Sequence, residues 1–245
     1  MATPRHLSRA PIAEATVDVR IEGRALQAAI LEPLANELTS TYPVLEPRSL
    51  MEATFSSVEG RLATQAQNLG VQGYFLRSTA RDRIVQLRVD GFTFNRLPQY
   101  VNAEEMLDEA IPLLMRYLDV AKPDVASRLA MRYINRLALP FDAGNDFNRF
   151  LTAAPPVPAE LPQMVSEFRT RVVLFYREME PVIVGQRLTT LLDKPSEVLL
   201  DVDAIKNGRF DLQEVSLRAH FGELRQRKND VFFAHLTEEA VNLYE

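Results

Sequence analysis

The feature that most constrains this chain is a strict alternation of apolar and polar residues in several short segments. The alternation is clearest over residues 12–22, where the apolar positions are Ala13, Ala15, Val17, Val19 and Ile21. Successive side chains of a strand point to opposite sides of a sheet, so this period of two predicts a half-buried strand. A fold built on a sheet with one polar face follows from it.

Residues 24–38 change to the four-residue spacing of a helix, with apolar residues at Leu26, Ile30, Leu34 and Leu38. Pro33 falls inside this spacing, and we expect it to kink or break the helix because proline lacks the backbone N–H. A second helix is expected from the capping pair of Asn102 and Glu105 to about residue 120, interrupted by Pro112 in the same way.

The remaining segments complete a pattern that occurs twice along the chain. Further strands are predicted at about 50–62, 71–79, 83–90, 127–140, 164–177, 181–192 and 196–203. The second half also carries a short helix, a proline-rich connector, a long helix and a helical tail, predicted at 146–151, 153–162, 211–227 and 229–245. Each half therefore has the order strand, helix, three strands, helix.

This repeated order predicts an α+β protein with one large, curved, mostly antiparallel sheet made of two pseudo-repeats. Helices should cover one face, and the sheet should be saddle-like or closed into a tunnel. Residues 1–121 would form the N-terminal half and residues 122–245 the C-terminal half with the helical tail, as one continuous domain. The alternative is two separate α+β domains joined by a protease-sensitive linker at 121–126.

The face of the sheet that the helices leave uncovered should be rich in charge of both signs. Its predicted residues are Glu14, Asp18, Arg20, Arg88, Asp90, Arg128, Arg132, Arg136, Glu167, Arg169, Arg171, Asp201 and Asp203. On an open sheet these groups would mostly form cross-strand ion pairs. On a concave sheet they would form a binding surface, for which we select Arg128, Arg132, Arg136, Arg169, Arg171, Arg88, Glu14 and Asp18.

The large excess of arginine over lysine is consistent with an anion-binding surface, although it has another explanation. The chain has 28 basic residues, of which only Lys122, Lys194, Lys206 and Lys228 are lysines, which leaves 24 arginines. The planar guanidinium suits two-point pairing with carboxylate or phosphate. Codon bias together with ordinary ion pairs is the other explanation, and the net charge of −5 argues against broad attraction to nucleic acid.

Most catalytic classes find no support in the sequence. The chain has no cysteine, and its three histidines, His6, His220 and His235, are far apart in sequence. Phosphate-binding loops, dinucleotide-binding glycine motifs, zinc-protease motifs and nucleophile elbows are all missing from the sequence. Asp201 and Asp203 share one strand face, as oxygen ligands of Mg²⁺ or Mn²⁺ would, unless Asp203 begins a turn. We therefore expect a protein without a cofactor.

Five blocks of the sequence carry a resemblance to a known family. They are LSRAPIAEATVDVRIE at 7–22, FTFNRLPQY at 92–100, RLAMRYINRLALP at 128–140, LLDVDAI at 199–205 and LRQRKNDVFFAHLTEEA at 224–240. The chain resembles a sporadically distributed family of uncharacterised bacterial and archaeal proteins of about this length. The resemblance implies no catalytic residue, and its patchy distribution suggests a role in a mobile phage-defence or toxin–antitoxin locus.

The sequence thus predicts a non-enzymatic binding protein that engages a protein partner through its arginine-rich sheet face or its C-terminal tail. One alternative is a metal-assisted enzyme acting on phosphates or nucleotides, with Mg²⁺ or Mn²⁺ on Asp201 and Asp203. Another is a saddle that binds nucleic acid. The N-terminus has no apolar signal region and no segment approaches the roughly 20 apolar residues of a membrane span, so we expect a cytoplasmic protein.

Overall fold

The chain forms one open, nine-stranded antiparallel sheet, in the order β2-β3-β4-β5-β1-β6-β9-β8-β7. The computed structural model describes residues 1–58, 61–98, 100–140, 146–189 and 197–245. The strands are β1 (Ile12–Glu22), β2 (Val44–Val58), β3 (Arg61–Arg77), β4 (Arg83–Arg88), β5 (Gly91–Arg96), β6 (Val125–Ala138), β7 (Glu167–Arg177), β8 (Glu180–Thr189) and β9 (Glu197–Phe210). The predicted α+β class and mostly antiparallel sheet are confirmed.

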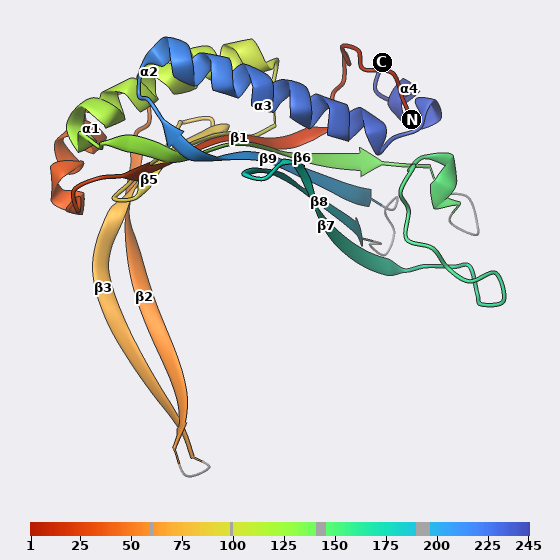
Figure 1. Cartoon of the computed structure of the whole chain (residues 1–245), viewed down its shortest axis with the longest axis horizontal. Helices are drawn as coiled ribbons and strands as arrows, with labels where there is room; N and C mark the ends of the chain where they lie inside the picture. The colour runs from red at the N-terminus through yellow and green to blue at the C-terminus, as the bar shows by residue number, and fades with distance from the viewer. Residues whose placement is uncertain (59–60, 99, 141–145, 190–196) are drawn as a thin grey trace.

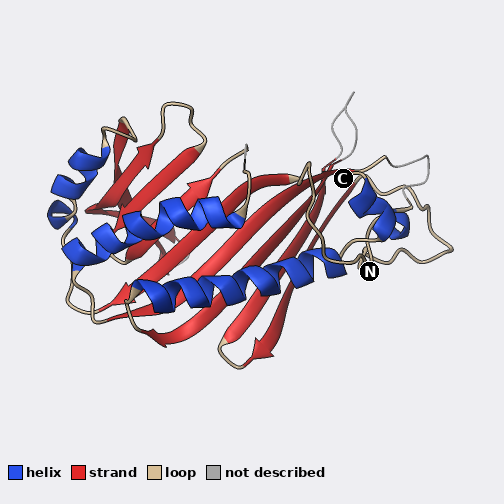
Figure 2. Cartoon of the chain, turned by 90° about the horizontal axis from the view of Figure 1, so that it is seen from above, coloured by secondary structure: helices blue, strands red, loops and turns tan. Residues whose placement is uncertain are grey.

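The three longer α-helices lie on the same face of this sheet (Figures 1 and 2). The α-helices are α1 (Glu32–Leu38), α2 (Ala103–Ala121), α3 (Glu214–Ala234) and the short α4 (Glu238–Asn242), with two 3₁₀ turns at Ala28–Ile30 and Phe147–Arg149. The core lies between α2, α3 and the alternate strand residues that point towards them, among them Val17, Phe94, Leu129, Met131, Tyr133 and Val202. Burial of these rows explains why the period of two in β1 and β6 is so regular.

Neither proline interrupts its helix as the sequence predicted. Pro33 lies in the first turn of α1, where the missing N–H has no partner to lose, so it begins the helix rather than kinking it. Pro112 lies inside α2, which nevertheless runs from Ala103 to Ala121. The predicted cap is confirmed, because the Asn102 side chain accepts a hydrogen bond from the Glu105 backbone N–H at 2.8 Å.

The strand predictions were wrong in three places. The predicted strand at 50–62 extends from β2 into β3, so that four strands, rather than three, lie between α1 and α2. Residues 91–96 form β5, which pairs with β4 through a tight turn at Val89 and Asp90, and this hairpin was missed although Asp90-Gly91 is a typical turn signal. Strand β9 continues to Phe210, whereas the sequence predicted a turn after Asp203. Continuous pairing with β6, including Ala130 with Ile205 and Leu129 with Lys206, holds the strand through this segment.

The strands of the two predicted halves join in a single sheet, because β1 pairs with β6 from Ile12 opposite Asn135 to Glu22 opposite Val125. The β2–β3 ribbon extends far beyond the rest of the sheet, on the side away from the helices (Figure 1). The proline-rich connector at 153–162 carries no helix or strand, as predicted. No helix in the described part of the chain is long and apolar enough to span a membrane.

Candidate functional site

The candidate site lies on the face of the sheet that the helices leave uncovered. In β6, Leu129, Met131 and Tyr133 are buried towards the helices, while Arg132 and Arg136 are exposed on the opposite side. Because neighbouring strands keep this alternation in register, the predicted charged residues of β1, β4, β6, β7 and β9 share this uncovered face. The prediction that the charged strand residues share one uncovered face is therefore supported.

In the centre of the uncovered face, Asp18 of β1 lies within ion-pair distance of three arginines, of which Arg88 and Arg128 are the closest. Its Oδ2 lies 2.9 Å from Arg88 Nη2 and its Oδ1 lies 2.5 Å from Arg128 Nη1. Asp18 also accepts a hydrogen bond of 2.8 Å from the Thr93 hydroxyl. Arg88 is only 5% exposed, and this burial lowers its pKa. The sequence predicted Arg88 as part of an accessible surface, but its guanidinium is enclosed and held by Asp18.

The same pairing continues along β6 and β9. Arg132 forms a two-point ion pair with Asp201, with nitrogen–oxygen distances of 2.8 Å and 2.6 Å, and this pairing raises the pKa of Arg132. Arg136 lies 3.5 Å from Glu197 in a more exposed pair. Glu14 of β1 accepts a hydrogen bond of 2.6 Å from the Asn95 amide. Partners within the sheet thus occupy most of the predicted binding residues.

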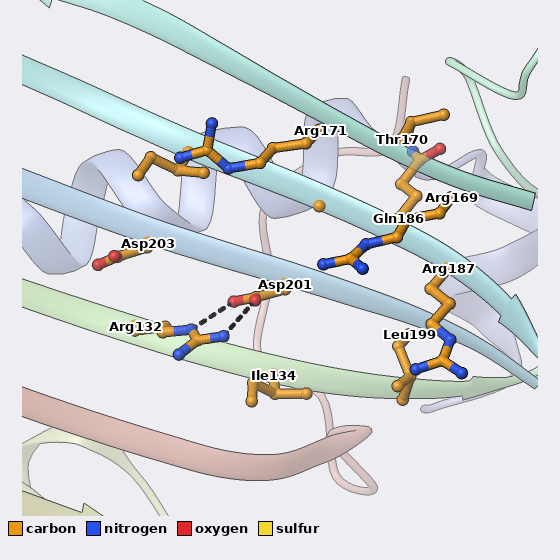
Figure 3. A pocket seen from close by; sticks show the side chains of 12 residues that line it. Arg132, Ile134, Arg169, Thr170, Arg171, Gln186, Arg187, Leu199, Asp201 and Asp203 are labelled. Atoms are coloured by element: carbon orange, nitrogen blue, oxygen red, sulfur yellow. Dashed lines mark hydrogen bonds and ion pairs between the residues drawn. The ribbon is translucent and has the colours of Figure 1, made fainter. Parts of the chain in front are cut away.

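A different arrangement is found where β7 and β8 complete the sheet. Arg169, Arg171 and Arg187 line an open concavity of about 440 Å³, together with residues of β6 and β9 (Figure 3). We call this the arginine concavity, and it is lined by Arg132, Ile134, Arg169, Thr170, Arg171, Ile183, Gly185, Gln186, Arg187, Leu199, Asp201 and Asp203. Its floor combines apolar side chains with Gly185, which opposes Arg171 on one side and Asp201 on the other.

The three arginines that β7 and β8 contribute to the arginine concavity have no carboxylate partner among the described residues, in contrast to those at the centre of the sheet. Arg169 and Arg187 are moreover direct cross-strand partners in the β7–β8 ladder. Like charges directly opposite each other on one face destabilise a sheet. An anion bound between the two guanidinium groups would relieve this repulsion.

Asp203 lies between the two regions and has an unusual environment. Its Oδ2 is 3.5 Å from Arg128 Nη2, while its buried Oδ1 has no hydrogen-bond partner among the described atoms. Burial raises the pKa of Asp203 to about 6, and the nearby Arg128 and Arg132 only partly offset this effect. A buried carboxyl with a raised pKa in a concavity is typical of functional sites.

The structure brings Arg132, Arg169, Arg171, Asp201 and Asp203 together in the arginine concavity, as the shared sheet face predicted. It places Arg88, Arg128, Glu14 and Asp18 in a neighbouring, ion-paired depression. Sequence analysis missed Arg187 and the open position at Gly185. The signal for both was present, because alternation within 181–192 puts these two residues on the polar side of β8.

Asp201 and Asp203 were predicted as possible metal ligands. Their carboxylates are directed to arginines, Asp201 to Arg132 and Asp203 to Arg128. Across the described ranges, no group of three or more His, Cys, Asp or Glu residues is placed to hold a metal ion. Comparison with known proteins adds no further assignment, since neither a protein-family model nor a curated protein sequence matches the chain.

Proposed function

We propose that this chain is a non-enzymatic binding protein whose arginine concavity takes an acidic segment of a partner protein. The observation that carries the proposal is the cross-strand pair of Arg169 and Arg187, which faces the concavity without a carboxylate partner among the described residues. Guanidinium groups bind carboxylates through two parallel hydrogen bonds. A partner with clustered Asp or Glu residues would supply the anions that this part of the sheet lacks.

The apolar part of the lining favours a peptide over a bare anion. Ile134, Ile183 and Leu199 lie beside the arginines in the concavity. A segment that combines acidic residues with one or two aliphatic side chains could use both kinds of contact, whereas inorganic phosphate could use only the charges. The interaction would be screened by salt, because the concavity is open to solvent.

We further propose that the uncovered face is a saddle built from two pseudo-repeats. Support comes from the strand order, since the first strand of each half, β1 or β6, lies beside the last strand of the same half, β5 or β9. The β2–β3 ribbon extends to one side of this face, and β7 bends in the same direction at the other end (Figure 1). Membership of the sporadic family and a role in a mobile defence locus are also proposals, supported by the sequence blocks alone.

The test is a binding assay with a fluorescent peptide of alternating glutamate and leucine residues. We expect wild-type protein to bind it at low salt and the Arg169→Glu/Arg187→Glu variant to bind at least about tenfold more weakly, since two charge-assisted contacts are lost. The control is Arg209→Glu, because Arg209 is an exposed arginine of β9 outside the arginine concavity. Failure to bind the peptide, or equal binding by the two variants, would overturn the proposal.

Two further arms of the same assay test the alternatives. A short DNA duplex that binds more tightly than the peptide, with steep salt dependence, would favour the nucleic-acid saddle. A rise in melting temperature with Mg²⁺ or Mn²⁺ and a nucleotide, abolished by Asp201→Asn, would favour the metal-assisted enzyme. We expect neither, because the sheet arginines already engage both carboxylates and the chain carries net negative charge.

A further inference from the structure

Strand β7 forms one edge of the sheet and exposes an unusual run of apolar side chains. Val172, Val173, Leu174, Phe175 and Tyr176 are each between 38% and 66% exposed, and they occupy both faces of the strand. The outer edge of β7 also offers its backbone N–H and C=O groups to a further strand. A long apolar edge of this kind is a template for pairing with another chain.

The opposite edge of the sheet is protected, and β7 is not. Strand β2 carries Pro47, which cannot donate a backbone hydrogen bond, and its pairing with β3 is shifted between Pro47 and Ser49 and again between Ser49 and Met51. Such prolines and irregularities are the usual means of blocking edge-to-edge association. Residues 167–177 contain no proline, and their pairing with β8 is regular up to Phe175.

We propose that β7 pairs antiparallel with β7 of a second copy of this chain, in the register that places Val172 opposite Val172. A two-fold axis perpendicular to the sheet would pass between these two valines. The pairs on either side would be Phe168 with Tyr176, Arg169 with Phe175, Thr170 with Leu174, and Arg171 with Val173. Each side chain would meet a partner on its own face of the sheet, because the paired numbers differ by an even count.

Charge selects this register over its neighbours. With Val172 at the centre, no arginine is opposite an arginine. Glu167 of one copy is opposite Arg177 of the other at each end of the strand pair. Moving the centre to Arg171 would place that arginine opposite its own copy. Moving it to Val173 would place Arg169 opposite Arg177, and like charges in direct opposition destabilise a strand pair. Of the three registers centred on Arg171, Val172 and Val173, only the one centred on Val172 opposes no two arginines.

The dimer would join the two sheets into one, with the helices of both copies on the same side. Arg169 and Arg171 face the arginine concavity from β7, so the two concavities would lie on either side of the shared strand pair. The inference goes beyond the proposed function, because a monomer could bind an acidic peptide through the same arginines. Association, in turn, does not require a peptide.

The absence of cysteine from the natural chain permits a direct test by single-cysteine cross-linking. In the proposed register, Val172→Cys would place two thiols directly opposite each other, within the separation that a disulfide spans. Under a mild oxidant we expect Val172→Cys to cross-link at least about tenfold faster than Val173→Cys. Val215→Cys is the surface control on α3, since Val215 is 81% exposed and therefore more accessible than Val172 at 49%, and it should still give only background cross-linking.

Sedimentation equilibrium measures the oligomeric state directly. The melting temperature of each variant, measured in parallel, shows whether a loss of the dimer is due to misfolding. Wild-type protein should dimerise, whereas Val172→Lys and Val172→Glu should each be monomeric with unchanged melting temperatures, because like charges would meet at the axis. An equimolar mixture of the two variants should recover a heterodimer. A monomeric wild-type protein, faster cross-linking of Val173→Cys, or a mixture that stays monomeric would overturn the proposal while leaving the peptide assay unaffected.

Discussion

The centre and the β7–β8 end of the uncovered face have similar charged residues but use them differently. At the centre, Arg88, Arg128 and Arg132 each contact a carboxylate of the same sheet. At the β7–β8 end, Arg169 and Arg187 are opposite each other, and no carboxylate in the described part of the chain pairs with either. The comparison shows that arginine content alone does not identify a binding surface. The two regions differ in whether the described residues of the sheet supply a carboxylate to each arginine.

The largest effect should come from breaking the central network at Asp18. Asp18→Ala would remove the closest carboxylate of the buried Arg88, leaving it only the more exposed Asp90 at 3.2 Å, and would remove one partner of Arg128. We expect the free energy of unfolding to fall by about 3 kcal/mol, the usual cost of breaking a buried ion pair by removing one partner. Urea denaturation measures this change. Arg187→Ala is the matched deletion at the β7–β8 end, and an equal loss there would remove the distinction between the two regions.

A smaller effect of opposite sign is expected at Asp203. Its pKa is raised to about 6 in the folded state from an ordinary value near 4, so the fold binds the proton more tightly than the unfolded chain does. The stabilising contribution is fully present below pH 4 and is lost as the pH rises through 6. Asp203→Asn should therefore stabilise the protein by about 2 kcal/mol at pH 8 and have little effect at pH 4.

Denaturation curves of the wild type and Asp203→Asn at the two pH values test this prediction. Asp201→Asn serves as the control, because the Asp201 carboxylate is satisfied by Arg132 and its removal should destabilise the fold. A stabilisation by Asp203→Asn that is the same at pH 4 and pH 8 would show that the raised pKa is not its cause.

The smallest effect on stability is expected at Gly185 in the floor of the arginine concavity. An added Cβ would lie 3.6 Å from the Asp201 Cβ, which is ordinary van der Waals contact. Gly185→Ala should raise the free energy of unfolding by about 0.5 kcal/mol, because glycine is unfavourable within a strand. It should also weaken binding of the acidic peptide by narrowing the space beside Arg171. A marked loss of stability would show that the position is structural.

The sheet, its polar face and the residues on it could be predicted because alternation is a local property. Alternation in β1 and β6 identifies Asp18, Arg128 and Arg132 without any knowledge of pairing. Which carboxylate each arginine meets depends on register between strands far apart in the sequence, as for Asp18 and Arg128. For this reason the sequence could not separate the occupied arginines from Arg169 and Arg187.

Tertiary contacts explain the failures of the fold prediction in α2 and β9. Pro112 was expected to interrupt α2, but the helix continues through it because Ile111, Leu114 and Tyr117 are packed in the core. The extension of β9 past Asp203 was missed because Lys206 and Asn207 suggest a turn, whereas Lys206 is buried and pairs with Glu223 of α3. Tertiary contacts of this kind override local propensity.

A single variant, Arg187→Glu, tests most directly whether the opposed arginines at the β7–β8 end bind an acidic segment. It is measured for both stability and peptide binding. The change would place a carboxylate opposite Arg169 and create the cross-strand ion pair that the central strands already have. We predict that the free energy of unfolding rises by about 0.5 kcal/mol while affinity for the acidic peptide falls at least about tenfold. A loss of stability together with unchanged peptide affinity would contradict the proposal that Arg169 and Arg187 bind an acidic partner.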